Sequence, residues 1–262
     1  MVKGFIRLIF RSIFNFIGYD IVFFKKKTMS IVAVDKNIWE PYFLNDSSMQ
    51  LYFEGIKHSK NEKSDNFYKQ LRFYSLQEAV NYVMHRRLKG DFVECGAFKG
   101  HSAYIISKII SKKEFDGRFH IFDSFEGGLS KKVEKDKNIR VKLSTNDIME
   151  EARSFSSSEI EVSYCLEDFE FIHLYKGWIP NRFYEVENRI FSFVHIDVDL
   201  YKPTLDSLNF FFPRLVSGGI IVCDDYGAVQ FPGAKKAVDE FLIGKEFTLF
   251  YRVPMGGCFL IK

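Results

Sequence analysis

The alternation of apolar, strand-like segments with helical segments is the feature that most constrains the fold of this chain. Strand-like runs occur at DFVEC, RFHIFD, FIHLYKG, IFSFVHIDV and GIIVCDD, with helical patterns between them, such as residues 101–113 and GAKKAVDEFL. Strands separated by helices imply a mostly parallel, doubly wound α/β sheet. The last segment, EFTLFYRVPMGGCFLIK, predicts an antiparallel hairpin that turns at residues 254–257.

The regular pattern becomes clear at YSLQEAV, so we predict a main domain over residues 71–262 and a separate N-terminal segment over residues 1–70. Residues 28–70 mix aromatic and polar side chains without a clear period, which predicts an irregular cap with short helices.

The first residues, MVKGFIRLIFRSIFNFIGYDIVFF, combine many apolar side chains with a polar stripe. Lys3, Arg7, Arg11 and Asn15 recur every four residues, as on one face of a helix. These polar residues, and the lack of a small-residue cleavage site, argue against a membrane span or a signal peptide. Two interpretations stay open: a helix on a membrane surface, with contact through residues 1–27, or a helix packed on the domain or in a dimer interface.

Composition excludes several classes of protein. A net charge of +3 over 262 residues leaves no strongly basic face for nucleic acid. The four cysteines are scattered without a CxxC pair, so neither a disulfide framework nor a zinc site is indicated. We therefore predict a cytoplasmic protein, associated with the inner face of the membrane if the N-terminal helix binds lipid.

A glycine turn follows the first strand-like run. In VECGAFKGHS, the spacing of Glu94, Gly96 and Gly100 is E-x-G-x-x-x-G, which differs from the dinucleotide-binding GxGxxG. A carboxylate here would repel a pyrophosphate but suits an ammonium group or a hydroxyl, so the turn indicates a ligand with an amino-acid end. The alternative is a purely structural turn.

Asp123 ends the next strand-like run, RFHIFD. An acid at this position typically accepts hydrogen bonds from ribose hydroxyls. Together with the glycine turn, it indicates a nucleoside ligand without a diphosphate. The alternative is that Asp123 caps the turn DSFEGG.

Three further aspartates follow two later strands. Asp197 ends one strand, and Asp224 and Asp225 end the next, so their carboxylates should converge. Carboxylates this close repel each other unless a cation lies between them, and oxygen ligands favour Mg²⁺, Mn²⁺ or Ca²⁺. The alternative is acidic loops that face only solvent. His195 should point to the same side as Asp197; we favour a hydrogen-bonded core histidine over a catalytic one.

Together, GDFVECGAFKGHSA, IFDSFEGG, GWIP, HIDVDLYKPTLDSL, GGIIVCDDYG and PGAKKAVDEF resemble the macrocin-type sugar O-methyltransferases. These form a metal-dependent branch of the class I S-adenosylmethionine (SAM) methyltransferases. The resemblance covers residues 65–262 and implies a seven-stranded sheet with an antiparallel last strand and helices on both faces.

The resemblance also implies roles for particular residues. For the cofactor, it implies that Glu94, Gly96 and Gly100 hold the methionine end of SAM, Asp123 the ribose, and Ser124, Gly177 and Trp178 the surroundings of the adenine, with Ser102 as a further contact. For the metal, it implies the ligands Asp197, Asp224 and Asp225. It implies Asp199 as the general base. The alternative for Trp178 is that it is an ordinary residue of the hydrophobic core. Asp197 could act as both metal ligand and general base.

The implied reaction is Mg²⁺- or Mn²⁺-assisted transfer of a methyl group from SAM to a sugar hydroxyl, in polysaccharide or natural-product biosynthesis. The implied partners are a sugar-containing acceptor and further copies of the chain. One rival is a glycosyltransferase that uses Asp197-Val-Asp199 as a D-x-D motif, and Glu94 and the second Asp pair argue against it. Another is a non-catalytic membrane-associated scaffold, which would have no reason to keep all of these acids.

Overall fold

The computed structural model describes residues 19–23, 31–35, 47–61, 65–126, 129–137, 155, 157–254 and 256–262. The chain divides into two compact units, Met1–Gln50 and Leu51–Lys262. In the first unit, strand β1 (Tyr19–Phe23) pairs antiparallel with β2 (Ile31–Asp35).

Neither strand was predicted: β1 falls within residues 1–27, where a helix was expected, and five residues are too few to show a strand period. The helix predicted from the stripe at residues 3–15 lies outside the described residues. Membrane contact, a cytoplasmic location, the domain boundary at residues 70 and 71, and assembly into oligomers stay predictions. In the part of the chain that the structure describes, no helix combines the length and apolarity that a membrane crossing requires.

The second unit is built on one seven-stranded sheet. Its strands are β3 (Asp91–Cys95), β4 (Phe119–Asp123), β5 (Ile172–Lys176), β6 (Phe191–Ile196), β7 (Leu215–Cys223), β8 (Leu249–Arg252) and β9 (Cys258–Ile261). Their spatial order is β5-β4-β3-β6-β7-β9-β8, and β9 runs antiparallel to both of its neighbours. The predicted doubly wound sheet with an antiparallel last strand is confirmed.

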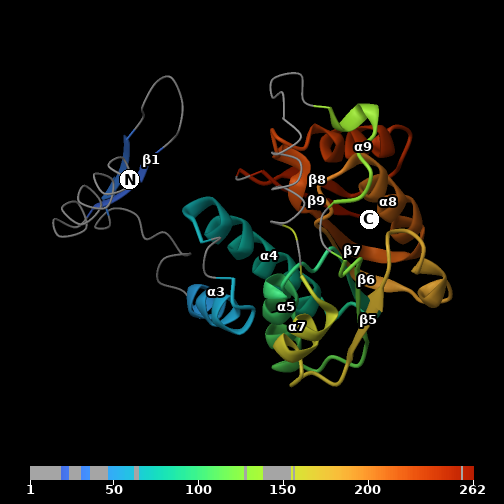
Figure 1. Ribbon diagram of the computed structural model, residues 1–262, viewed down its shortest axis with the longest axis horizontal. Helices are drawn as coiled ribbons and strands as arrows, with labels where there is room; N and C mark the ends of the chain where they lie inside the picture. The colour runs from blue at the N-terminus through green and yellow to red at the C-terminus, as the bar shows by residue number, and fades with distance from the viewer. Residues whose placement is uncertain are drawn as a thin grey trace. The chain divides into compact units, whose positions relative to one another are not determined.

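Helices cover both faces of this sheet. The described helices are α3 (Ser47–His58), α4 (Phe67–His85), α5 (His101–Ser111), α7 (Glu159–Cys165), α8 (Tyr201–Arg214) and α9 (Pro232–Leu242), with short 3-10 turns η2 (Glu134–Asp136), η3 (Phe183–Val186) and η4 (Asp224–Gly227). In Figure 1, α4, α5 and α7 lie on one side of the sheet and α8 and α9 on the other. The polar helix predicted near residues 146–155 lies almost wholly outside the described residues.

The two faces of β6 differ because successive side chains on a strand point to opposite sides. Val194 and Ile196 join the apolar cluster that contains Phe211 of α8. His195, between them, points to the α4–α5 side, where Glu94 of β3 is its partner in the strand register. The sheet is therefore apolar towards α8 and α9 but carries titratable groups towards α4 and α5.

Helix α4 is longer than the sequence pattern indicated. It begins at Phe67, where the side chain of Asn66 accepts a hydrogen bond from the backbone N–H of Lys69, an N-cap that stabilises a helix start. Its buried stripe includes Phe73, Leu76 and Val80. The extra turns bring charged residues of α4 to the end of the sheet where β6 and β7 finish.

At the opposite end of the strands, Asp91 anchors a buried polar network. Its carboxylate accepts hydrogen bonds from Arg189 and from the backbone N–H of Arg118, and it lies 2.9 Å from Nε2 of His120. Burial alone would raise the pKa of Asp91, but the hydrogen bonds from His120 and Arg189 outweigh burial and hold that pKa well below its usual range.

Replacing Asp91 by asparagine is therefore expected to lower the free energy of unfolding by about 3 kcal/mol at neutral pH, since it leaves Arg189 and His120 without their charged partner. Urea unfolding measures the difference. Because the folded-state pKa is depressed, the contribution is present above the unfolded value of about 3.9 and is lost as pH falls through the folded value. Asp116→Asn, at an exposed ion pair with Lys89, is the control. Equal stability of Asp91→Asn and the wild type at pH 7 would contradict this role.

Candidate active site

The crevice beside the glycine turn lies at the point where the order of strands reverses, between β3 and β6. Gly96 has φ +88°, and a Cβ on it would lie 1.9 Å from the carbonyl oxygen of Asp197. Only glycine fits both this backbone conformation and this close approach. The turn after β3 therefore packs directly on the chain that leaves β6, which places the two predicted sites side by side.

A cavity of about 360 Å³ opens at this edge of the sheet. Predicted site residues that line it are Gly96, Ser102, Asp123, Ser124, Trp178, Asp197, Asp199 and Asp225. The same cavity thus joins the predicted cofactor residues to the acidic ones.

Asp123 is held rigidly at the end of β4. One carboxylate oxygen accepts hydrogen bonds from the backbone N–H groups of Ala97 (2.8 Å) and Phe98 (2.9 Å), and the other accepts one from Phe125 (2.9 Å). Each carboxylate oxygen can accept more than one hydrogen bond. Asp123 therefore both caps the turn and keeps acceptor capacity facing the cavity.

Trp178 lies in the cavity wall, where its Nε1 donates a hydrogen bond to Glu126 at 3.1 Å. It is half-buried, unlike a core tryptophan. Gly177 does not line the cavity; its backbone N–H instead donates to the carbonyl of Asp123, which ties the two loops together.

Glu94 and Gly100, predicted to hold the methionine end of SAM, also do not line the cavity. Glu94 is fully buried, and its Oε1 lies 2.8 Å from Nδ1 of His195. Gly100 precedes α5 with φ +81°, and a Cβ on it would touch Val162 and Cys165 of the α7 segment. Glu94 lies inside β3, where its side chain points along the face of the sheet towards His195, whereas Gly100 follows the turn and packs against α7.

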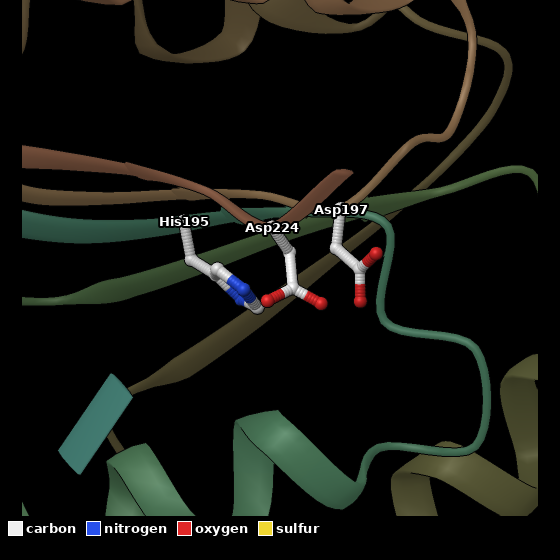
Figure 2. A group of neighbouring side chains, drawn as sticks. All are labelled: His195, Asp197 and Asp224. Carbon is white, nitrogen blue, oxygen red and sulfur yellow. The ribbon is translucent and has the colours of Figure 1, made fainter. Parts of the chain in front are cut away.

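The predicted acidic cluster forms, with a different grouping from the one predicted. His195, Asp197 and Asp224 each offer a ligand atom within 4.8 Å of the others. Figure 2 shows these three side chains extending to the same side of the strands. Asp225 lies beside them, but its Oδ2 accepts a hydrogen bond from the backbone N–H of Asp199 at 2.8 Å. His195 is thus hydrogen-bonded in the core, as favoured, yet it also borders the acids.

Three of the buried carboxylates, those of Asp197, Asp199 and Asp225, have raised pKa values because burial and their neighbours oppose the charged form. Burial, followed by repulsion from Asp224, raises the pKa of Asp197 to about 6. Burial and the neighbouring acids raise the pKa of Asp199 to about 8, and they raise that of Asp225 as well. A divalent cation would relieve this repulsion, so the donor set fits such an ion.

Two cations that sequence reasoning missed, Lys69 and Arg72 of α4, also line the cavity. Arg72 forms an ion pair through Nη2 with Oδ2 of Asp224. A signal was present in the sequence: Arg72 lies four residues before Leu76 and Lys69 four before Phe73, so both continue the buried stripe of the helix.

The strand order and a ligand cavity at its switch point define a class I methyltransferase fold. The chain belongs to the Macrocin-O-methyltransferase (TylF) family, whose model matches residues 66–249. The family that the motifs indicated is therefore confirmed.

Several characterised O-methyltransferases are similar to this chain in sequence. They are a demethyldecarbamoylnovobiocin O-methyltransferase of Streptomyces niveus (23% identical; 65% of this chain, 64% of the relative), an 8-demethyl-8-(2,3-dimethoxy-alpha-L-rhamnosyl)-tetracenomycin-C 4'-O-methyltransferase of Streptomyces olivaceus (26%; 59% and 60%) and a mycinamicin III 3''-O-methyltransferase of Micromonospora griseorubida (25%; 65% and 67%). This chain thus spans 60% to 67% of the length of these relatives.

Solved structures share the fold. The O-methyltransferase NovP matches with a TM-score of 0.58 at 20% identity, over 83% of this chain and 99% of that chain. The calicheamicin methyltransferase CalS11 matches with a TM-score of 0.57 at 18% identity, over 81% of this chain and 91% of that chain. The SAH-bound methyltransferase PaMTH1 of Podospora anserina matches with a TM-score of 0.50 at 13% identity, over 82% of this chain and 87% of that chain.

Proposed function

We propose that this protein is a SAM-dependent O-methyltransferase that methylates a sugar hydroxyl of a glycosylated metabolite or glycan, assisted by a divalent cation. The single observation that carries the proposal is the cavity of about 360 Å³, which joins the glycine turn and Asp123 to the acids Asp197, Asp199 and Asp225. Membership of the macrocin family supports the reaction, and the names of the relatives support a sugar-bearing acceptor.

The donor would lie along the wall between the glycine turn and Trp178. Asp123 supplies the acceptor for the ribose hydroxyls, since its carboxylate is fixed at the end of β4. Gly96 lets the backbone approach the ligand closely, and Ser124 and Trp178 border the space next to the ribose. SAM supplies an electrophilic methyl group on a sulfonium.

The metal would be held by Asp197 and Asp224, with Asp225 or His195 as a further ligand. Mg²⁺ or Mn²⁺ lowers the pKa of a bound hydroxyl and fixes its orientation. Asp225 accepts the hydrogen bond from Asp199 with one carboxylate oxygen, so its other oxygen is available to a metal ion. Glu94 orients the ring of His195 through its contact with Nδ1.

Asp199 is placed to act as the general base. It lines the cavity and is buried. Its backbone has a left-handed conformation (φ +61°), and its backbone N–H donates a hydrogen bond to the carboxylate of Asp225. The acceptor oxygen forms a bond to the methyl carbon as the carbon–sulfur bond breaks, and its proton passes to Asp199. Proton removal of this kind contributes roughly 10²–10⁴-fold.

Calorimetric titration with S-adenosylhomocysteine (SAH), and with UDP- and GDP-sugars plus Mg²⁺, tests the donor assignment. Micromolar SAH binding that weakens about tenfold or more in Asp123→Asn is expected, because the ribose loses a charged acceptor. Asp116→Asn is the control, and a melting curve checks that each variant folds. Metal-dependent binding of a nucleotide sugar alone would instead favour the glycosyltransferase.

A further inference from the structure

Arg72 of α4 places a permanent positive charge at the acidic cluster. It lines the cavity, and its Nη2 forms an ion pair with Oδ2 of Asp224. The side chain of Arg72 is 30% exposed and that of Asp224 is 11% exposed, so water and salt screen this pair only in part. Because an arginine side chain stays protonated, Asp224 has a charged partner within the protein itself.

The acidic cluster acts strongly on Arg72. Burial alone would lower the pKa of its guanidinium, but four carboxylates outweigh burial and raise that pKa. They belong, in order of decreasing effect, to Asp224, Asp197, Asp225 and Asp199. One guanidinium does not balance these acids, since burial and Asp224 still raise the pKa of Asp197 to about 6 in its presence. Further positive charge is needed to balance the cluster.

Asp224 is the residue at which a metal ion and Arg72 would meet. In Figure 2 its carboxylate lies between His195 and Asp197, and these three residues offer ligand atoms within 4.8 Å of one another. Oδ2 of the same carboxylate contacts Arg72. A cation at this cluster would therefore lie close to the guanidinium, and two positive charges repel strongly where water screens them little.

The contact of Arg72 with Asp224 differs from a fixed structural ion pair. Arg189 donates to both carboxylate oxygens of Asp91, through Nε and Nη2, and such a two-point contact fixes a guanidinium. Arg72 contacts Asp224 through Nη2, while its Nε is buried and has no hydrogen-bond partner among the described residues. An unpaired buried donor costs free energy, so a shift of the guanidinium off Asp224 loses one contact and opens Nε to a new acceptor.

We propose that Arg72 is an internal counter-ion of the cation site: its guanidinium holds Asp224 in the metal-free protein and competes with the divalent cation for that carboxylate. This inference rests on the cation of the proposed function. Arg72 keeps the acids together when no metal is bound, and the same charge weakens the binding of the metal. It is a positioning residue, and it sets the metal concentration that the site requires.

Calorimetric titration of Mn²⁺ into the full chain, without SAH or acceptor, measures this competition. Arg72→Met keeps an unbranched apolar stem and removes the charge, so it is expected to bind Mn²⁺ at least about tenfold more tightly than the wild type. Arg72→Lys keeps the charge, and its affinity for Mn²⁺ is expected to stay close to that of the wild type. Arg86→Met is the matched control, since Arg86 is exposed at the end of the same helix.

Melting curves with a chelator and with saturating Mn²⁺ give a second readout. With the chelator, Arg72→Met is expected to melt below the wild type, because the acids lose their counter-ion. With saturating Mn²⁺ this difference should shrink or reverse, since an ion that binds the folded variant more tightly stabilises it more. An arginine with only a structural role would lower the melting temperature equally in both conditions. Arg72→Gln replaces Arg72→Met if the methionine variant does not fold.

Unchanged or weaker Mn²⁺ binding in Arg72→Met would overturn the inference, and so would an equal gain in Arg72→Lys, which keeps the charge. Both results leave the proposed function standing, because the wild type still binds the ion. If neither the wild type nor any variant binds Mn²⁺, the inference and the metal of the proposed reaction fail together, and SAH binding then decides whether the donor site stands.

Discussion

Replacing Asp224 by asparagine is expected to lower methyl transfer by about 10³-fold while leaving the binding of SAH unchanged. Asp224 offers a ligand atom to the cluster with Asp197 and His195 but does not line the ligand cavity. The change therefore removes a metal ligand without touching the donor. It also removes a negative charge that raises the pKa of Asp197, and it takes the ion-pair partner from Arg72, so a melting curve checks that the variant folds.

The measurement is a rate of methyl transfer over a series of Mg²⁺ and Mn²⁺ concentrations, beside calorimetry with SAH. Wild-type activity should vanish with a strong chelator and return with either ion. Asp239→Asn is the control, since Asp239 pairs with Lys235 on the exposed side of α9. Full activity of Asp224→Asn in the presence of the chelator would rule out the metal-assisted reaction.

Replacing Asp199 by asparagine is expected to lower kcat by roughly 10²–10⁴-fold with little change in KM, because the proton of the acceptor hydroxyl loses its base. Asparagine tolerates the left-handed conformation at this position (φ +61°) and keeps the size of the side chain. The backbone N–H of Asp199 can still donate to Asp225, so the loop should keep its shape.

The pH profile supplies the discriminating observation. Burial and the neighbouring acids raise the pKa of Asp199 to about 8 in the absence of a cation. A base works only when deprotonated, so kcat of the wild type should fall as pH drops below this pKa. A cation at the neighbouring ligands lowers the pKa, so at saturating metal this fall should begin at lower pH. The Asp199→Asn variant should lack this fall in kcat at low pH. A variant that keeps both the rate and the profile would make Asp197 the base instead.

The predicted part of the site consists of residues that end strands. Asp123, Asp197 and Asp225 follow or end apolar runs, and the ends of parallel strands meet at one edge of a sheet. Their convergence could therefore be predicted from the order of segments alone.

The prediction was less complete where a side chain lies inside a strand or on a separate helix. The acidic character of Glu94 indicated a ligand contact, but in the structure its carboxylate contacts His195 on the neighbouring strand β6. Lys69 and Arg72 continue the buried stripe of α4, but the ion pair that brings Arg72 to Asp224 joins distant parts of the chain, and no local pattern reports such a contact.

The sequence by itself determined the doubly wound sheet and the final hairpin, because the period of apolar residues is a local property of the chain, and its motifs at the strand ends carried the resemblance that implied the antiparallel last strand and the family. Only the tertiary structure decided which polar groups meet: His195 with Glu94, Arg72 with Asp224, and Lys69 beside His101. The pair of His195 with Glu94 depends on the register of β6 beside β3, and the other two pairs depend on how α4 packs against α5 and across the ends of β6 and β7.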